Sequence, residues 1–382
     1  MRCLPDPLLA STPDPTPQPP CARAQDLASP VAASVGPQGT PPAKSSSTTF
    51  IAWTPGANHN RAEEVCRRLG VRPVFTGRLF REGSLHSKLL LWLDYSYRAI
   101  YTLASLARQR PRVVFAQCPP SFCPMTCWLY CAATGARLVV DGHNAAFEPP
   151  WIRVPGHFFV LRRASAVLVH NLELFRCVKE RFPGITFRLL PTPLMPQPQA
   201  APERPSAGAR YLLVVVSFAP DEPLEQVLEG IAAYLSRSPD APRVKVTGNY
   251  LKAPAIRRKF VAVPGLEFLG YVDKAAYYDL LRNAWGVLGF STRLMVQQGA
   301  CVEAVAAGVP MVLSESETNR RLCANSALFA KPEPAAVAEA LERFERDRDN
   351  LARAAWLDKA AWERDWQHCY AELCASLRLP PA

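Results

Sequence analysis

Short apolar runs alternate with amphipathic segments over most of this chain, and the alternation predicts strands followed by helices. The first series of predicted strands comprises Thr48–Trp53, Arg72–Thr76, Arg112–Gln117, Ala136–Val140, Ala166–His170 and Thr186–Leu190. Helical spacing marks the segments between several of them, namely Arg61–Leu69, Ser87–Gln109 and Ser121–Ala133. Strands that alternate with helices favour βαβ units and a parallel sheet.

The same pattern begins again after a proline-rich interruption. Its predicted strands are Tyr211–Ser217, Arg243–Thr247, Leu266–Leu269, Trp285–Phe290 and Pro310–Ser314. Its predicted helices are Leu224–Leu235, Ala275–Asn283, Cys301–Ala307, Ala335–Asp347 and Asp349–Leu377. The chain therefore resolves into two doubly wound α/β halves, and ligands of such sheets bind at the carboxyl ends of the strands.

Length and proline distribution suggest where the domains lie. A chain of 382 residues exceeds the roughly 250–300 residues that one core supports, so two domains are expected. Residues 1–47 are rich in Pro, Ser and Thr and predict a disordered tail. We expect an N-terminal Rossmann-like domain over 48–190, a linker over 191–209 and a C-terminal Rossmann-like domain over 210–354. The remaining residues, 355–382, predict helices that pack back towards the N-terminal domain.

The twelve cysteines indicate a reduced, intracellular protein rather than a disulfide framework. Cys123, Cys127 and Cys131 recur every four residues and share one helix face. We expect them to pack in a core, with a metal or cluster site as the alternative. The sequence has no apolar run of about 18 residues and no secretory pattern at its start, so neither a spanning helix nor a signal peptide is expected.

The segment from His86 to Arg110 combines many aromatic and aliphatic side chains with several cations. We expect a crossover helix packed on a core, which is the commoner arrangement. Contact with an anionic bilayer is the alternative. The net charge of +11 fits a polyanionic partner, but no basic stripe with interleaved aromatic residues indicates nucleic acid.

The most informative pattern lies between Phe290 and Glu317. A predicted strand leads into Ser291-Thr292-Arg293, and a helix begins at Gly299 and ends before Gly308-Val309-Pro310. Backbone N–H groups at such a helix start can bind a phosphate. Arg293 can pair with a diphosphate, and Glu303, one turn inside the helix, can accept hydrogen bonds from sugar or ribose hydroxyls. An ordinary αβ unit would account for Gly308 and Pro310 but poorly for the two charged residues.

The motif Gly-x-x-x-Glu-Ala-x-x-x-Gly-x-Pro resembles the donor-site signature of GT-B glycosyltransferases of the group 1, family 4-like kind. The loops that start at Ser217 and at Val246 resemble those of β-1,4-mannosyltransferases of lipid-linked oligosaccharide assembly. The resemblance implies an α/β GT-B fold of two Rossmann-like, doubly wound domains facing across a cleft. Met295 stands where the family often has a first glutamate, and Asp221 and Glu222 stand where it usually has a basic clamp. The donor-binding residues would be Ser217, Thr292, Arg293, Gln298, Gly299, Ala300 and Glu303.

Three loops of the first half end predicted strands and are candidates for the acceptor side, one of them Gln117–Ser121 as a wall of the acceptor site. In the family, an Asp-x-His-Asn loop faces the cleft, and here it contains Asp141 and His143, with the histidine as a general base or sugar contact oriented by the aspartate. A plain turn is the alternative. The loop after the first strand contributes candidates for binding a phosphate or the acceptor: Gly56, Asn58, His59 and Arg61.

These residues predict a glycosyltransferase, a hexosyltransferase in class, that moves a sugar from a nucleoside-diphosphate sugar to a hydroxyl in cell-surface glycan or glycolipid synthesis. A UDP-sugar 2-epimerase of the same fold and a non-catalytic nucleotide-sugar-binding protein are the alternatives. We expect no obligatory cofactor and no metal. The expected partners are a nucleotide sugar and a glycan or polyprenol-linked acceptor. We expect a cytoplasmic protein, with peripheral association at the inner face of the membrane as one alternative.

Overall fold

The computed structural model describes residues 47–53, 60–71, 73–80, 88–195, 210–238 and 240–378. The proline-rich segment before residue 47, most of the expected linker, and the loop that holds Gly56, Asn58 and His59 lie outside the described residues. The side chains of Asn60 and Lys88 are likewise outside. Everything below concerns the described part of the chain.

The first half forms a six-stranded parallel sheet in the order β2-β1-β3-β4-β5-β6. Its strands are β1 (Thr48–Ala52), β2 (Pro73–Phe75), β3 (Val113–Cys118), β4 (Arg137–Gly142), β5 (Ala166–Val169) and β6 (Phe187–Leu189). The central strands are buried on both faces, as expected for a parallel sheet covered by helices. In register, Gln117 pairs with Asp141, so the side chains that end these strands gather at one edge.

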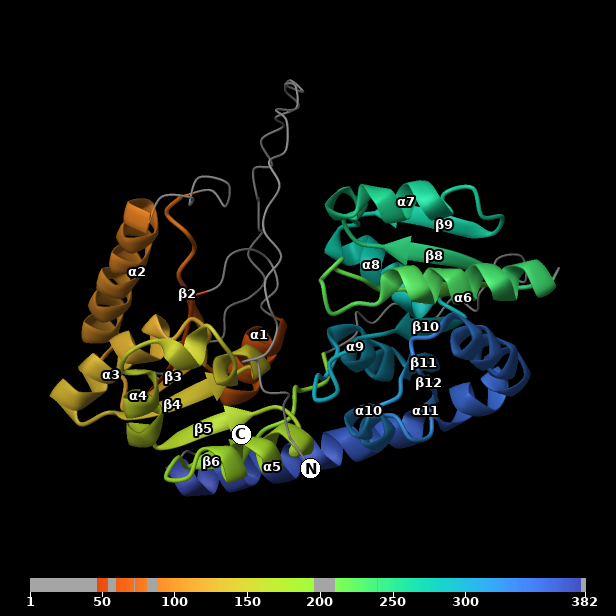
Figure 1. Ribbon diagram of the computed structural model, residues 1–382. Coiled ribbons are helices and arrows are strands. Elements are labelled where there is room, and N and C mark those ends of the chain that lie inside the picture. Colours follow the sequence, from red (N-terminus) through yellow and green to blue (C-terminus); the bar gives the residue numbers. More distant parts are fainter. Residues whose placement is uncertain are drawn as a thin grey trace. The chain divides into compact units, whose positions relative to one another are not determined.

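Helices connect these strands and cover the sheet (Figure 1). They are α1 (Asn60–Leu69), α2 (Lys88–Gln109), α3 (Phe122–Thr134), α4 (His157–Arg163) and α5 (Leu172–Arg181). Local sequence sets their ends: the Asn171 side chain accepts a hydrogen bond from Leu174 N at the start of α5, and Gly135 ends α3 with φ 73°. Helices α4 and α5 were not among the helices predicted from the sequence.

The second half forms another six-stranded parallel sheet, in the order β12-β11-β10-β7-β8-β9. Its strands are β7 (Tyr211–Val214), β8 (Arg243–Thr247), β9 (Leu266–Gly270), β10 (Gly286–Gly289), β11 (Met311–Ser314) and β12 (Ala327–Ala330). Its helices are α6 (Leu224–Arg237), α7 (Pro254–Phe260), α8 (Lys274–Arg282), α9 (Gly299–Ala307) and α10 (Glu317–Leu322). Two parallel doubly wound sheets confirm the predicted fold class.

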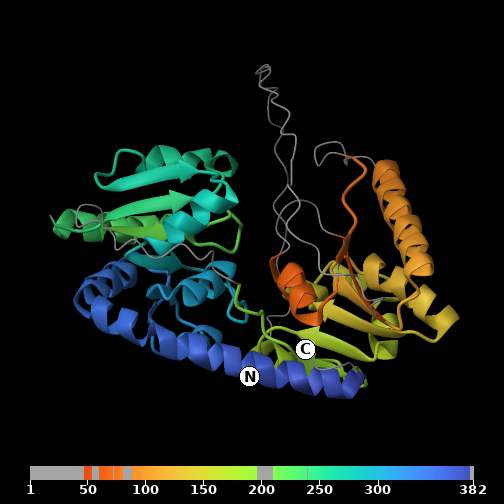
Figure 2. The same ribbon diagram turned by 180° about the vertical axis from the view of Figure 1, so that it is seen from behind.

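The C-terminal region is one helix, α11 (Pro334–Leu377), of 44 residues. The sequence predicted two helices with a break at Arg348, and this is wrong, because no Gly or Pro stands there and the polar run continues the helix. The first part of α11 packs on α6 and the second core, and Trp366, Tyr370 and Leu373 pack with the first sheet. Both views show α11 passing along the first sheet beside β6 and α5 (Figures 1 and 2).

Cys123, Cys127 and Cys131 lie on the buried face of α3 within the core under the first sheet, as expected. Burial raises the pKa of the Cys131 thiol to about 12, so this thiol is protonated and uncharged at neutral pH.

Helix α2 agrees in part with its prediction. Leu106, Tyr95 and Ala99 pack on the core as expected, but Asp94, Arg98 and Thr102 also face inward, and much of the helix's apolar surface faces outward. No helix within the described residues is long and apolar enough to cross a membrane.

Candidate functional site

At the carboxyl edge of the first sheet, Asp141 is enclosed by one arginine and two histidines. The Arg61 guanidinium donates to its carboxylate, with Nη2 2.9 Å from Oδ1 and Nε 3.2 Å from the same oxygen. His143 Nε2 lies 3.6 Å from Oδ2 and His170 Nε2 lies 3.5 Å from Oδ1. Asp141 is 1 % exposed. Arg61 also donates to the carbonyls of Leu190 and Pro191.

The charges of this cluster follow from burial and neighbours. Burial alone would raise the pKa of Asp141, but the Arg61 guanidinium and the two imidazoles hold it well below its usual range. Burial, together with the charge of Arg61, lowers the pKa of His170 to about 3. At neutral pH the cluster therefore contains an ionised Asp141, a cationic Arg61 and a neutral His170.

His143 is the more accessible of the two histidines, with a side chain 34 % exposed. Its Nε2 lies 3.1 Å from the side-chain nitrogen of Gln117, which ends the neighbouring strand. The rings of His143 and His170 meet edge to face with centroids 4.6 Å apart. Asp141 and Gln117 therefore orient His143 from behind, while one side of its ring remains available to a ligand.

Asp141, His143 and His170 offer three ligand atoms within 4.8 Å of one another, the one such group in the described part of the chain. The guanidinium of Arg61 already occupies both carboxylate oxygens of Asp141. Its full positive charge disfavours a divalent cation at the same place.

In the second sheet, β10 ends at Gly289, one residue before the predicted end, and α9 begins at Gly299, where the sequence predicted a helix start. The Gln298 side chain does not cap the helix. A Cβ on Gly299 would meet no atom within 4 Å, so the amides at this helix start are approachable. Gly289 lies beneath them, and a Cβ there would lie 2.7 Å from Gln298 Oε1, so a larger residue would displace the Gln298 side chain.

The loop from Phe290 to Gln298 contains buried polar atoms that lack hydrogen-bond partners among the described residues. Both side-chain polar atoms of Gln297 and the Oε1 of Gln298 are buried without a hydrogen-bond partner among the described residues. Buried amide groups normally have partners. Their position beside an uncapped helix start is consistent with a polar ligand bound there.

Arg293 extends from this loop and forms an ion pair with Glu148, which belongs to the first half of the chain. Thr292 donates its backbone N–H to the carbonyl of Asp221 at 2.8 Å. Ser217 is tied to the carboxylate of Glu222 through its N–H and its hydroxyl. Asp221 and Glu222, the acidic residues where the family usually has a cation, therefore stabilise loops at the edge of the second sheet.

Glu303 faces away from the helix start towards α8. The hydroxyl of Tyr277 donates to its Oε2 at 2.5 Å, and burial together with the charge of Glu303 raises the pKa of that tyrosine. The carboxylate is half-buried, with one oxygen held by the phenol. Tyr277 was not a predicted site residue.

The carbonyl of Met295 joins the two candidate regions. It accepts hydrogen bonds from the Asn144 side chain at 2.5 Å and from the Asn171 side chain at 3.1 Å. Each asparagine directly follows one of the clustered histidines, His143 and His170. The backbone at the position of the missing glutamate thus fixes the Arg293 loop against the histidine cluster.

Only some of the site residues predicted in the first half lie together in the structure. Asp141 and His143 lie together, but Gly56, Asn58 and His59 are outside the described residues. Arg61, expected to reach a phosphate, is buried and committed to Asp141. Sequence reasoning gave no role to His170, although it ends a predicted strand, which was the available signal.

Among the residues of the second half, sequence reasoning also missed Lys252. It follows β8, in the short 3-10 helix Tyr250–Lys252, and its Nζ donates to the carbonyl of Ser217 at 3.2 Å. A cation therefore stands beside the loop after β7, although it comes from the next strand along the sheet. The available signal was its place in a loop after a predicted strand.

Comparison with known proteins gives a match at the level of three-dimensional structure. HepE from Anabaena, solved with UDP and glucose, superposes with a TM-score of 0.64 over 87 % of this chain and 99 % of its own, at 12 % sequence identity. The chain has the GT-B fold. Sucrose-phosphate synthase from Thermosynechococcus elongatus (TM-score 0.63, 12 % identity, 86 % and 99 % covered) and a UDP-forming α,α-trehalose-phosphate synthase from Burkholderia xenovorans (0.63, 11 %, 87 % and 99 %) match similarly. No protein-family model and no curated protein sequence matches the chain.

Proposed function

We propose that this GT-B protein is a glycosyltransferase that moves a sugar from a nucleoside-diphosphate sugar to a hydroxyl group. The observation that carries the proposal is the placement of one loop, Phe290 to Gln298. It leads from Arg293 into the uncapped start of α9, and it is held against Asn144, next to His143. A donor diphosphate at the helix start would therefore lie near an accessible imidazole. The solved structures of similar fold that contain UDP support the choice of donor.

In the reaction, the bond between the anomeric carbon and the diphosphate oxygen breaks, and a bond from that carbon to the acceptor oxygen forms. Negative charge grows on the leaving diphosphate. The amides of Gly299 and Ala300, the guanidinium of Arg293 and the ammonium of Lys252 are the groups assigned to stabilise it. For Arg293 to do so, its pair with Glu148 must open or be shared.

Glu303, Gln298, Thr292 and Ser217 are assigned to the nucleotide sugar, with Tyr277 holding Glu303 in place. His143 contacts the transferred sugar or accepts the proton of the acceptor hydroxyl, with Asp141 and Gln117 orienting its ring. Arg61 and His170 fix Asp141 and do not touch substrate. The acceptor is a glycan or a polyprenol-linked sugar, with peripheral association at a membrane and a role in cell-surface glycan or polysaccharide synthesis.

The proposal is tested by incubating the protein with a panel of nucleotide sugars and measuring release of nucleoside diphosphate. The expected result is release from one donor, and loss of it in Arg293→Ala and Glu303→Ala. The Arg320→Ala variant is the matched control, because Arg320 forms an exposed ion pair with Glu315, and neither residue belongs to the loop. Nucleotide binding without release from any donor would support a binding protein and contradict the proposal, and interconversion of the sugar without acceptor would indicate an epimerase.

A further inference from the structure

Helix α2 turns several polar side chains inward and exposes much of its apolar surface. Asp94 and Arg98 form a buried ion pair at 2.9 Å, and Thr102 accepts a hydrogen bond from the indole of Trp53 at 2.9 Å. Large side chains on the outer surface are more than a third exposed: Leu89, Leu91, Trp92, Leu93, Tyr97, Ile100 and Tyr101. A contiguous exposed apolar surface of this kind marks an interaction face rather than a solvated one.

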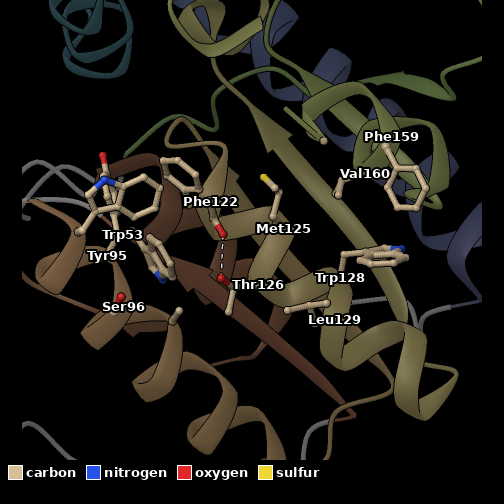
Figure 3. Close-up of a pocket in the computed structure, with 13 residues that line it drawn as sticks. Trp53, Tyr95, Ser96, Phe122, Met125, Thr126, Trp128, Leu129, Phe159 and Val160 are labelled. Carbon is tan, nitrogen blue, oxygen red and sulfur yellow. Dashed lines mark hydrogen bonds between the residues drawn. The ribbon is translucent and has the colours of Figure 1, made fainter. Parts of the chain in front are cut away.

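A pocket of about 420 Å³ opens beside this surface, between α2, α3 and α4. Its size lies in the roughly 300–1,000 Å³ range of small-molecule sites. Aromatic rings line it at both ends: the tilted rings of Tyr95 and Phe122 have centroids 4.8 Å apart, and Trp128 meets Phe159 edge to face at 5.0 Å. Figure 3 shows Met125 between these two groups of rings. The lining is almost wholly apolar, so the pocket suits a hydrocarbon chain.

The exposed charges on the described residues of helices α2, α3 and α4 are all positive. Across α2, α3 and α4 the one acidic residue is Asp94, and it is buried against Arg98. Arg162 and Arg163 on α4 are exposed, and the Arg163 guanidinium lies 3.8 Å from the ring centre of Phe159, which lines the pocket. Arg108, also exposed, stands at the end of α2. Tryptophan, tyrosine and arginine beside an apolar face are the composition that favours a membrane interface.

We propose that this face, defined by the outer surface of α2 and the pocket between α2, α3 and α4, binds an anionic lipid bilayer, and that the pocket receives one hydrocarbon chain of a lipid. The positive charges beside this face favour an anionic bilayer over a second copy of the chain. A second copy docked face to face would bring the same arginines together, whereas anionic headgroups would pair with Arg162 and Arg163. The polar inner face of α2 is consistent with a helix whose apolar side is covered by lipid.

This inference assigns a surface to the membrane association in the proposed function. The binding itself does not depend on glycosyl transfer, but its biological role rests on the proposed function. Trp53, which lines the pocket, directly follows β1. Strand β1 pairs in parallel with β3, so the pocket adjoins the same edge of the sheet as Gln117 and Asp141.

The first test is co-sedimentation of the full chain with vesicles of phosphatidylcholine, with and without phosphatidylglycerol. We expect binding to the anionic vesicles, and partitioning weakened about tenfold or more in Leu93→Glu and Ile100→Glu, because each removes a large apolar group from hydrocarbon. Val261→Glu is the matched control, since Val261 is exposed at the end of α7. Equal binding of all four proteins, or none by the parent protein, would overturn the proposal. Retained UDP binding by Ile100→Glu shows that a loss belongs to this face and not to the donor site.

The second test examines the pocket itself with lipids brominated on their acyl chains, which quench nearby tryptophans. We expect quenching of the bound protein, and a clear reduction of it in Trp128→Phe, because this half-buried ring lines the pocket. Trp356→Phe is the control, because this exposed tryptophan lies on α11. Quenching that Trp128→Phe leaves unchanged would contradict entry of a chain into the pocket. Circular dichroism of each variant verifies that it is folded.

Discussion

The guanidinium of Arg61 holds the carboxylate of Asp141 through two nitrogens, with Nη2 2.9 Å and Nε 3.2 Å from Oδ1. The two residues are 80 positions apart in the sequence and are both buried. Since His143 and His170 also face this carboxylate, the pair is the structural support of the candidate acceptor site.

Replacing Arg61 by Ala is expected to destabilise the fold strongly. The change leaves a buried carboxylate without its main counter-charge, which typically costs about 3–5 kcal/mol. Urea unfolding measures the loss. Arg176→Ala is the control, because Arg176 forms an exposed pair with Glu317 at 3.5 Å and such pairs contribute about 0–1 kcal/mol. Similar losses in the two variants would argue against a supporting role for Arg61.

Stability is expected to fall as the pH drops below about 6.5, in part through His157. Burial lowers the pKa of His157 to about 4, so between these values the unfolded chain binds a proton that the folded protein does not. The contribution of His157 to the free energy of unfolding should fall by up to about 3 kcal/mol between neutral pH and pH 4. Urea unfolding at several pH values checks this. His157→Gln, which keeps a polar partner for Ser121, should flatten the dependence, and an unchanged slope would refute it.

The Arg293 and Glu148 pair predicts opposite effects on nucleotide binding. Arg293→Ala should weaken the affinity for UDP about tenfold or more, because it removes charge-assisted hydrogen bonds to a phosphate. Glu148→Gln should strengthen it, because the competing carboxylate is gone. Isothermal titration measures both, and Arg320→Ala serves as the control. A weakening in Glu148→Gln would mean that this glutamate supports the donor site.

Tyr277→Phe tests the contact at 2.5 Å between the tyrosine hydroxyl and Glu303. The loss of one donor frees the carboxylate to move, so we expect weaker binding of a nucleotide sugar and a smaller effect on the nucleotide alone. Tyr278→Phe, on the same helix, is the matched control. Equal affinity of the two variants for the nucleotide sugar would contradict a role of the Tyr277 hydroxyl in positioning Glu303.

The sequence was sufficient for the two-sheet fold because buried parallel strands appear as apolar runs and Gly, Pro and polar residues punctuate them. It was also sufficient to place the helix start at Gly299, where Gln298 and the glycines give a local signal. It was not sufficient for Arg61, whose chemistry fits a phosphate or a carboxylate equally well. Only the order of the strands brings it to Asp141.

Helix α2 shows a second limit. The spacing of its apolar residues indicated an amphipathic helix but did not show which face is buried. Asp94 and Arg98 can face inward because they form an ion pair with each other. His170 and Asn171 were missed for a related reason. Their contacts, with Asp141 and with the carbonyl of Met295, join residues that are far apart along the chain.

The most direct measurement of the central claim is a crystal structure of the protein with a nucleoside diphosphate. The account predicts phosphate oxygens within hydrogen-bond distance of the Gly299 and Ala300 amides, with the Arg293 guanidinium turned from Glu148 towards them. A diphosphate bound elsewhere, with the start of α9 untouched and Arg293 still paired to Glu148, would contradict it.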